Sequence, residues 1–321
     1  MTTVAAALAA ARTKLPASEA RLLLRHVLGR AASWLIAHDE TQLDEAALLG
    51  FASLVARRTG GEPVPYLVGY REFFGREFAV STAVLIPRPE TELLVEIALA
   101  RVMRSGALHT GALHARDPAA RAGNSALCPE GALSPGGTRA GIPWDSGGDA
   151  AASKSAARIL DLGTGSGCIA VTLALEIPQA HVSAVDASGA ALLVARQNAE
   201  RHGARLRLLQ SDWFDRLAGE CFDLVVANPP YIAAADPHLA AGDLRHEPPA
   251  ALSSGADGLD AIRRIIAAAP AHLAPGGQLW LEHGYDQAEA VRELLATAGL
   301  ADIEQRRDLA GIVRVSGGRL R

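Results

Sequence analysis

Apolar residues recur with a helical period from the start of the chain to about residue 60. The first stripe predicts a helix and consists of Val4, Leu8 and Leu15. A Leu-rich face follows over residues 16–29, with Ser18 as the predicted N-cap and Gly29 at the expected C-terminal cap. Two amphipathic helices are therefore expected at the start.

A further helix is predicted over residues 45–58, where the same period continues. Thr41 and Asp44 resemble a capping box before it, and Gly60 ends it. Helices of this kind bury their apolar faces against one another. We therefore interpret residues 1–64 as a small helical domain.

Alternation of apolar and polar positions replaces the helical period over residues 66–81, where aromatic residues flank Gly75. Such alternation with glycine at the bend is typical of a β-hairpin. Residues 65–88 are interpreted as a hairpin connector, after which Pro89 or Glu90 opens a helix.

Residues 104–156 are rich in Ala, Gly, Ser and Pro and show no sustained period. Such a segment buries too little apolar surface to offset the ordering of its backbone, so we expect a flexible insertion. His109, His114 and Cys128 fall within it, but their spacing matches no known pattern of metal ligands.

Strand and helix patterns alternate in the remaining part of the chain. The predicted strands that lead up to the final pair span residues 157–162, 181–186, 205–210, 222–228 and 278–284. Helical patterns separate most of them, which predicts a doubly wound, mainly parallel α/β sheet. The final runs, 302–308 and 312–316, are too close for a crossover and must pair antiparallel. This plan resembles that of class I methyltransferases, and residues 89–321 are assigned to such a domain.

Composition narrows the class of protein. The chain has 321 residues, 49% of them hydrophobic and 21% charged, with a net charge of −4, as in an ordinary soluble protein of two domains. The slight excess of acid argues against direct binding of nucleic acid. No uninterrupted apolar stretch is long enough to span a membrane. The 3 cysteines form no close pair, which fits a reducing cytoplasm.

The first strand of the sheet runs into a loop, "DLGTGSG", that opens a helix. Glycines there allow positive φ and a close approach of the backbone to a ligand. We expect the loop to contact a cofactor through Gly163, Thr164, Gly165, Ser166 and Gly167. The dinucleotide fingerprint G-x-G-x-x-G fits less well, because the third glycine comes one residue early. NAD is therefore the weaker candidate.

Acidic and aromatic residues follow the next two strands. Asp186 ends the second strand, where a carboxylate can accept both ribose hydroxyls of an adenosine ligand; the alternative is a helix N-cap. Trp213, beside Asp212, follows the third strand and suits an adenine ring, although a Trp there can also be core. Together with the glycine loop, these residues point to S-adenosylmethionine, whose methyl transfer needs no metal or nucleophilic residue.

The sequence "NPPY", Asn228 to Tyr231, follows the fourth strand, which lies next to the first in such a sheet. The Asn228 side-chain oxygen and the Pro229 carbonyl can each accept one N–H of a planar NH2 group. Pro230 adds no competing donor, and Tyr231 can pack against the flat acceptor. The alternative is a plain turn. Adenine, cytosine and glutamine side chains all qualify as acceptors.

The chain resembles the release factor glutamine methyltransferases, the HemK or PrmC family, over nearly its whole length. The matching stretches are "YREFFGREFAV", "VLIPRPETE", "ILDLGTGSG", "AVDASGAALLVARQNA", "QSDWF", "NPPYI", "LEHG" and "RDLAGIVRV". The resemblance implies methylation of N(5) of the GGQ glutamine in class 1 release factors, with the helical domain gripping the factor. It implies cofactor contacts from residues 163–167, Asp186, Trp213 and Asn228, and a substrate pocket formed by residues 228–231.

Two other classes stay open from the residues alone: a DNA or RNA amino-methyltransferase, and a non-catalytic adaptor with the same fold. The first lacks a recognisable base-reading domain, and the second does not explain why every expected site residue is present. Glu282 and His283, in "LEHG", are expected near the crevice in a supporting or packing role. A monomer is the simplest expectation.

Overall fold

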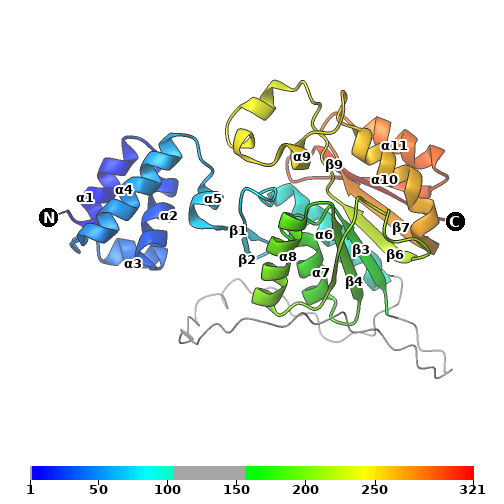
Figure 1. Ribbon diagram of the computed structural model, residues 1–321, viewed down its shortest axis with the longest axis horizontal. Helices are drawn as coiled ribbons and strands as arrows, with labels where there is room; N and C mark the ends of the chain where they lie inside the picture. Colours follow the sequence, from blue (N-terminus) through cyan, green and yellow to red (C-terminus); the bar gives the residue numbers. More distant parts are fainter. Residues whose placement is uncertain (1, 105–155) are drawn as a thin grey trace.

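In the computed structural model, which describes residues 2–104 and 156–321, an N-terminal helical bundle adjoins a sheet flanked by helices (Figure 1). The helices of the bundle and its connection are α1 (Val4–Arg12), α2 (Ala17–Leu28), α3 (Ala32–Ala37), α4 (Glu45–Thr59) and α5 (Val64–Val68). Their apolar faces enclose one core, in which Leu23 and Leu24 are fully buried and Phe51 is nearly so. The bundle therefore has a core separate from that of the sheet.

Helix starts in the bundle differ in part from the predicted caps. Ser18 is not an N-cap, because α2 begins at Ala17 directly after Pro16, whose ring fixes the backbone at the entry. Asp44 alone caps α4, its Oδ1 accepting from the Ala47 N–H at 2.7 Å. Gly29 ends α2 in the left-handed conformation, as predicted.

A short antiparallel hairpin, β1 (Tyr70–Phe73) and β2 (Arg76–Ala79), follows the bundle. Gly75 makes the bend with a φ of 73°, as predicted. The start of the predicted alternation is instead helical, because α5 continues to Val68.

The main sheet has seven strands in the order β5-β4-β3-β6-β7-β9-β8. The strands are β3 (Arg158–Leu162), β4 (His181–Asp186), β5 (Arg207–Gln210), β6 (Phe222–Ala227), β7 (Leu273–Glu282), β8 (Ala301–Arg307) and β9 (Val313–Arg319). The first five are parallel, and β9 pairs antiparallel with both β7 and β8. The predicted sheet and its antiparallel end are confirmed. Strand order reverses beside β3, between β4 and β6, where open α/β sheets bind ligands.

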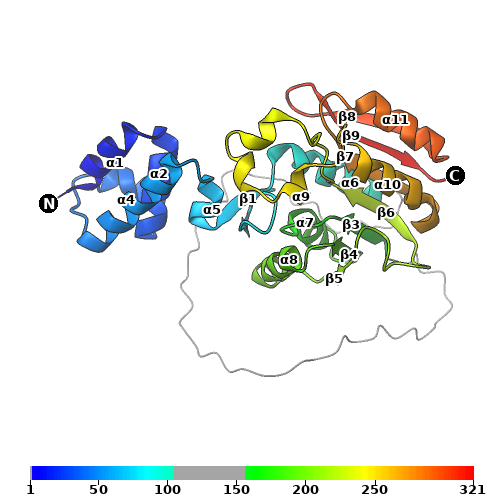
Figure 2. The same cartoon turned by 45° about the horizontal axis from the view of Figure 1, so that its top comes forward.

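Helices cover both faces of the sheet (Figures 1 and 2). One face carries α6 (Glu92–Arg104), α7 (Cys168–Glu176) and α8 (Gly189–His202). The other carries α10 (Asp260–Ala268) and α11 (Ala288–Thr297). The remaining short helices in the described part of the chain are η1 (Pro89–Thr91), η3 (Pro237–Ala240), η4 (Leu244–His246), α9 (Pro249–Leu252) and η5 (Ala269–His272).

Polar contacts join the bundle to the loop that follows β6. Arg58 on α4 pairs with Glu19 on α2 and, through Nη1, with Asp243 at 2.8 Å. Arg245 donates from Nη2 to the Gly60 carbonyl at 3.0 Å. These contacts bring the helical bundle against the segment between η3 and α9.

Most of the predicted insertion, residues 105–155, lies outside the described residues. In the part of the chain that the structure describes, no helix is long and apolar enough to cross a membrane.

We expect Asn198→Ala to lower the free energy of unfolding by about 2 to 4 kcal/mol, measured by urea denaturation. Asn198 is fully buried on α8, where its oxygen accepts from the Ala79 N–H and its nitrogen donates to the carbonyls of Ala79 and Ser166. As a control, Arg201→Ala removes an exposed ion pair with Glu77 on the same two elements and should cost less than about 1 kcal/mol. Equal losses for the two variants would contradict this role.

Candidate active site

A cavity opens at the carboxyl ends of β3, β4 and β6, at the reversal of strand order. Its wall includes four residues of the glycine loop, the segments after β4 and β5, part of the "NPPY" segment, and the connector before η1. The residues from these segments that line it are Ala83, Val84, Leu85, Pro87, Arg88, Gly163, Thr164, Gly165, Ser166, Asp186, Ala187, Ser188, Ser211, Asp212, Trp213, Asn228 and Pro230.

The glycine loop has the geometry that close contact with a ligand requires. Gly163, Gly165 and Gly167 have φ values of 69°, 55° and 80°. A Cβ on Gly163 would lie 3.2 Å from the Trp213 ring, so only glycine fits there without displacing that ring. Gly167 differs from the other predicted loop residues, since it does not line the cavity. It precedes α7, and a Cβ there would lie 3.1 Å from Ala195.

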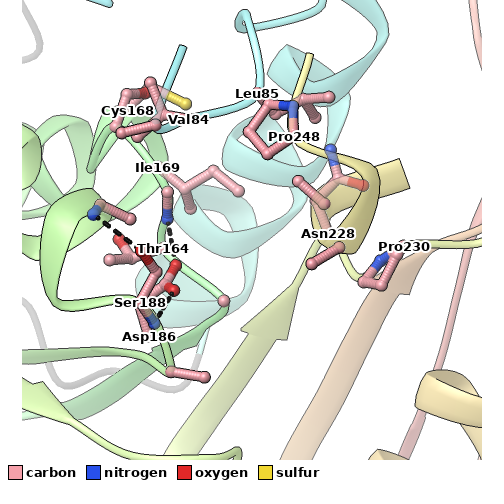
Figure 3. A pocket seen from close by; sticks show the side chains of 18 of the residues that line it. Val84, Leu85, Thr164, Cys168, Ile169, Asp186, Ser188, Asn228, Pro230 and Pro248 are labelled. Atoms are coloured by element: carbon pink, nitrogen blue, oxygen red, sulfur yellow. Dashed lines mark hydrogen bonds between the residues drawn. The ribbon is translucent and has the colours of Figure 1, made fainter. Parts of the chain in front are cut away.

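Asp186 lies on the cavity wall at the end of β4 (Figure 3). Its Oδ2 accepts from the Gly165 N–H at 2.9 Å, and its Oδ1 accepts from the Ser188 N–H at 2.8 Å. Burial raises the pKa of this carboxyl, and the two backbone donors oppose the rise. Each oxygen keeps a lone pair for a further donor, such as one of two neighbouring hydroxyls. Ser188, and not Asp186, is the N-cap of α8.

Trp213 lines the cavity, and its ring lies against Gly163. Its backbone has a φ of 49°, which is unfavourable for a large side chain and aims the ring at the glycine loop. The ring also packs against the apolar core that α10 and α11 form on one face of the sheet, so its packing role is observed. Asp212 lines the same cavity and pairs with Arg264 at 2.8 Å.

A smaller cavity adjoins the first one at the "NPPY" segment. It contains all four of the predicted substrate-pocket residues, Asn228, Pro229, Pro230 and Tyr231. Both cavities share Asn228, Pro230, Leu85, Arg88 and Ala251. Figure 3 shows Asn228 and Pro230 across the larger cavity from Asp186. Asn228 thus lies where the two cavities meet.

Asn228 belongs to a chain of side-chain hydrogen bonds. Its Nδ2 donates to Thr91 Oγ1 at 3.0 Å, and Thr91 Oγ1 donates to Glu282 Oε2 at 2.7 Å. The Tyr231 hydroxyl donates to the other oxygen, Oε1, of Glu282 at 3.1 Å. Glu282 is 1% exposed, and this burial raises its pKa to about 7. Two residues of the "NPPY" segment are therefore hydrogen-bonded to one buried carboxylate, Tyr231 directly and Asn228 through Thr91.

His283 has the packing role expected of it. It is fully buried, with Nδ1 at 2.9 Å from the Gly284 carbonyl and Nε2 at 2.8 Å from Ser316 Oγ. Burial lowers the pKa of its imidazole.

Sequence reasoning missed the connector as part of the cavity wall. Leu85 and Arg88 line both cavities, and Thr91 lines the larger one and bonds to Asn228. The stretch "IPRPETE" was interpreted as the end of the connector, with a helix opening at Pro89 or Glu90, and as a match to the family, but not as part of the cavity wall. Its prolines end the hairpin connector and start η1 at Pro89, which was a signal that Thr91 is held in a fixed turn.

The described residues of this site offer neither a reactive thiolate nor a cluster of metal ligands. Cys168 lines the larger cavity, and burial raises the pKa of its thiol to about 12. Among residues 2–104 and 156–321, no group of three His, Cys, Asp or Glu side chains is placed to hold a metal ion.

Comparison with known proteins identifies relatives of both parts of the chain. Residues 1–69 match the family model of the PrmC N-terminal domain, and residues 149–257 match that of the methyltransferase small domain.

Two relatives are release factor glutamine methyltransferases that match the chain almost throughout. The one from Bordetella pertussis is 48% identical over 307 residues, covering 95% of this chain and 96% of the relative. The one from Burkholderia pseudomallei is 49% identical over 313 residues, covering 95% and 93%. Among solved structures, a 16S rRNA methyltransferase (RsmC) from T. thermophilus is 19% identical, with a TM-score of 0.45, and covers 78% of this chain and 50% of that chain.

We expect Asp186→Asn to weaken the binding of S-adenosylhomocysteine about tenfold or more, measured by isothermal titration calorimetry, because the amide keeps only one accepting oxygen. Glu220→Gln is the matched control. Glu220 pairs with Arg158 and Arg207, which begin β3 and β5 at the opposite end of the sheet. The Glu220→Gln variant should bind S-adenosylhomocysteine with the affinity of the wild type. An unchanged affinity in Asp186→Asn would show that Asp186 does not contribute to binding.

Proposed function

The chain belongs to the release factor glutamine methyltransferases, and from that premise we propose that it methylates N(5) of the glutamine in the GGQ motif of class 1 peptide chain release factors. The methyl donor is S-adenosylmethionine. The coarser activity, transfer of a methyl group to a release factor, is that of the relatives as they are named. The GGQ glutamine as acceptor fits the planar NH2 group that the "NPPY" segment suits.

The residues of the larger cavity fit the methyl donor. Gly163 lets the Trp213 ring pack against the glycine loop, and this ring lines the cavity, where its aromatic surface suits the flat adenine. Asp186 offers lone pairs for the two ribose hydroxyls. We propose that residues 163–167, Asp186, Trp213 and Asn228 hold the donor, with Gly167 acting through the packing of α7 instead of through direct contact.

S-adenosylmethionine supplies a methyl group on a positively charged sulfur, which becomes a neutral thioether when the carbon–sulfur bond breaks. An amide nitrogen attacks poorly because its lone pair is delocalised. We propose that Asn228 Oδ1 and the Pro229 carbonyl accept its two N–H bonds, hold the nitrogen in line with the methyl group and stabilise the charge that develops. As the nitrogen–carbon bond forms, the nitrogen gives one proton to solvent.

Asn228 lies at the junction of the two cavities, and this placement carries the proposal. A donor in the larger cavity and a side chain entering by the smaller one would meet there. Pro229 and Tyr231 line the smaller cavity and not the larger one, which supports their proposed role in binding the acceptor. Tyr231 is tied to Glu282 by its hydroxyl, so its ring is held as one wall of that entrance.

The helical bundle, residues 1–64, is proposed to bind the release factor. Its contacts with the loop after "NPPY", through Arg58 and Arg245, support this role, since a protein held by the bundle would lie beside the smaller cavity. Leu244, in that loop, lines the smaller cavity directly.

We expect labelled methyl groups from S-adenosylmethionine to enter a purified class 1 release factor and not its GGQ variant with Gln→Ala. Scintillation counting of the separated proteins makes the measurement, with DNA and RNA as parallel acceptors. Label in the nucleic acid, or equal label in the Gln→Ala factor, would reject the proposed acceptor.

We expect Asn228→Ala to lower kcat by about 100-fold or more while the protein remains folded, because one of the two acceptors for the substrate N–H bonds is lost. Single-turnover methylation of the release factor measures this, with circular dichroism as the check on folding. Arg292→Ala, which removes an exposed ion pair with Glu289 on α11, should keep full activity. Near-normal turnover in Asn228→Ala would mean that another group holds the amide.

A further inference from the structure

Glu282 is a buried carboxylate with few partners. It is 1% exposed, and its hydrogen-bond partners in the described part of the chain are the hydroxyls of Thr91 and Tyr231. No arginine or lysine among the described residues forms an ion pair with it. Burial of an unpaired carboxylate costs free energy that an apolar residue would not. Its presence therefore calls for an explanation other than stability.

The direction of each hydrogen bond follows from the charge on Glu282. An ionised carboxylate only accepts hydrogen bonds, so the single O–H of Thr91 must donate to Glu282 Oε2. The Thr91 oxygen can then only accept from Asn228, at 3.0 Å, which requires the Nδ2 of the amide on that side.

The orientation of the Asn228 amide matters for the acceptor. With Nδ2 turned to Thr91, Oδ1 points away from it and has no hydrogen-bond partner among residues 2–104 and 156–321. That oxygen is free to accept an N–H from a substrate NH2 group. A flipped amide would present two donors to the same group and repel it.

We propose that Glu282 is a positioning residue for methyl transfer: by fixing the Thr91 hydroxyl, it makes Asn228 present its oxygen to the acceptor NH2. The inference rests on the proposed function, since it concerns how the same site holds the amide. The effect passes from Glu282 on β7 through Thr91 on η1 to Asn228 at the end of β6. Glu282 is 191 positions from Thr91 in the sequence, and Thr91 is 137 positions from Asn228. The connector thereby becomes part of the catalytic arrangement.

The groups around Glu282 set the pH at which this arrangement holds. Glu90 raises its pKa and Arg314 lowers it, but burial has the largest effect and brings the pKa to about 7. Tyr231 and Cys168 face it also; the pKa of the phenol is raised far above its usual value, and that of the thiol is raised to about 12, so both stay neutral. The required form is the ionised one, so activity is present above pH 7 and falls as the pH drops through about 7.

Among residues 2–104 and 156–321, a second buried carboxyl has a pKa raised into the same range. Burial raises the pKa of Asp161, beneath the glycine loop, to about 7 as well. The pH profile of the wild type alone therefore does not identify the group, and variants are needed.

The test compares Thr91→Val, Thr91→Ser and Glu282→Gln with the wild type in methylation of a class 1 release factor. Thr91→Val keeps the shape but lacks the hydroxyl, so we expect kcat to fall about tenfold or more, with unchanged affinity for S-adenosylhomocysteine. Thr91→Ser keeps the hydroxyl and should retain kcat within about threefold. A merely structural role would not separate these two variants in kcat alone.

Glu282→Gln should lower kcat about tenfold or more and remove the loss of activity below about pH 7, because its neutral amide can donate to Thr91 and reverse the chain. If this variant fails to fold, the two Thr91 variants decide the question. Equal kcat in Thr91→Val and wild type overturns the inference. A wild-type protein that does not methylate the factor overturns the proposed function instead, so the two failures are distinguishable.

Discussion

Parallel pairing of β3 with both β4 and β6 is the constraint on which the site depends. Because the carboxyl ends of parallel strands meet at one edge, the glycine loop, Asp186 and Asn228 come together although the sequence separates them widely. The reversal of strand order beside β3 sends the crossovers to opposite faces and leaves the edge between them open. The apolar cores on both faces of the sheet hold these strand ends in place.

The second requirement is that elements outside the sheet close this open edge. The connector and η1 supply Leu85, Arg88 and Thr91, and the segment after β6 supplies Ala251, which lies in α9. Glu247, in the same segment after β6, is buried, accepts from the Ile86 N–H at 2.9 Å and pairs with Arg88. One acidic side chain thus fastens the two segments to each other. The walls of the cavities are consequently built by contacts that are remote in sequence.

Local signals explain what could be predicted. Alternating patterns gave the strands and their parallel sense, and the short link between β8 and β9 gave the antiparallel end. Asp186 and the glycines were predicted from their place after a strand, and the structure puts them on or beneath one cavity. Contacts between distant segments were not predictable in this way. Thr91 looks like any helix-start residue until β7 brings Glu282 beside it, and Ser18 failed as a cap because Pro16 determined where α2 begins.

The left-handed backbone at Trp213 has a consequence for how the protein can change. That conformation costs about 1 to 2 kcal/mol for a residue with a side chain, and glycine would adopt it freely. Glycine at this position would nevertheless remove the wall that faces Gly163. The backbone conformation and the shape of the cavity therefore favour different residues at this one position, and the protein retains local backbone strain where Trp213 forms part of the cavity wall.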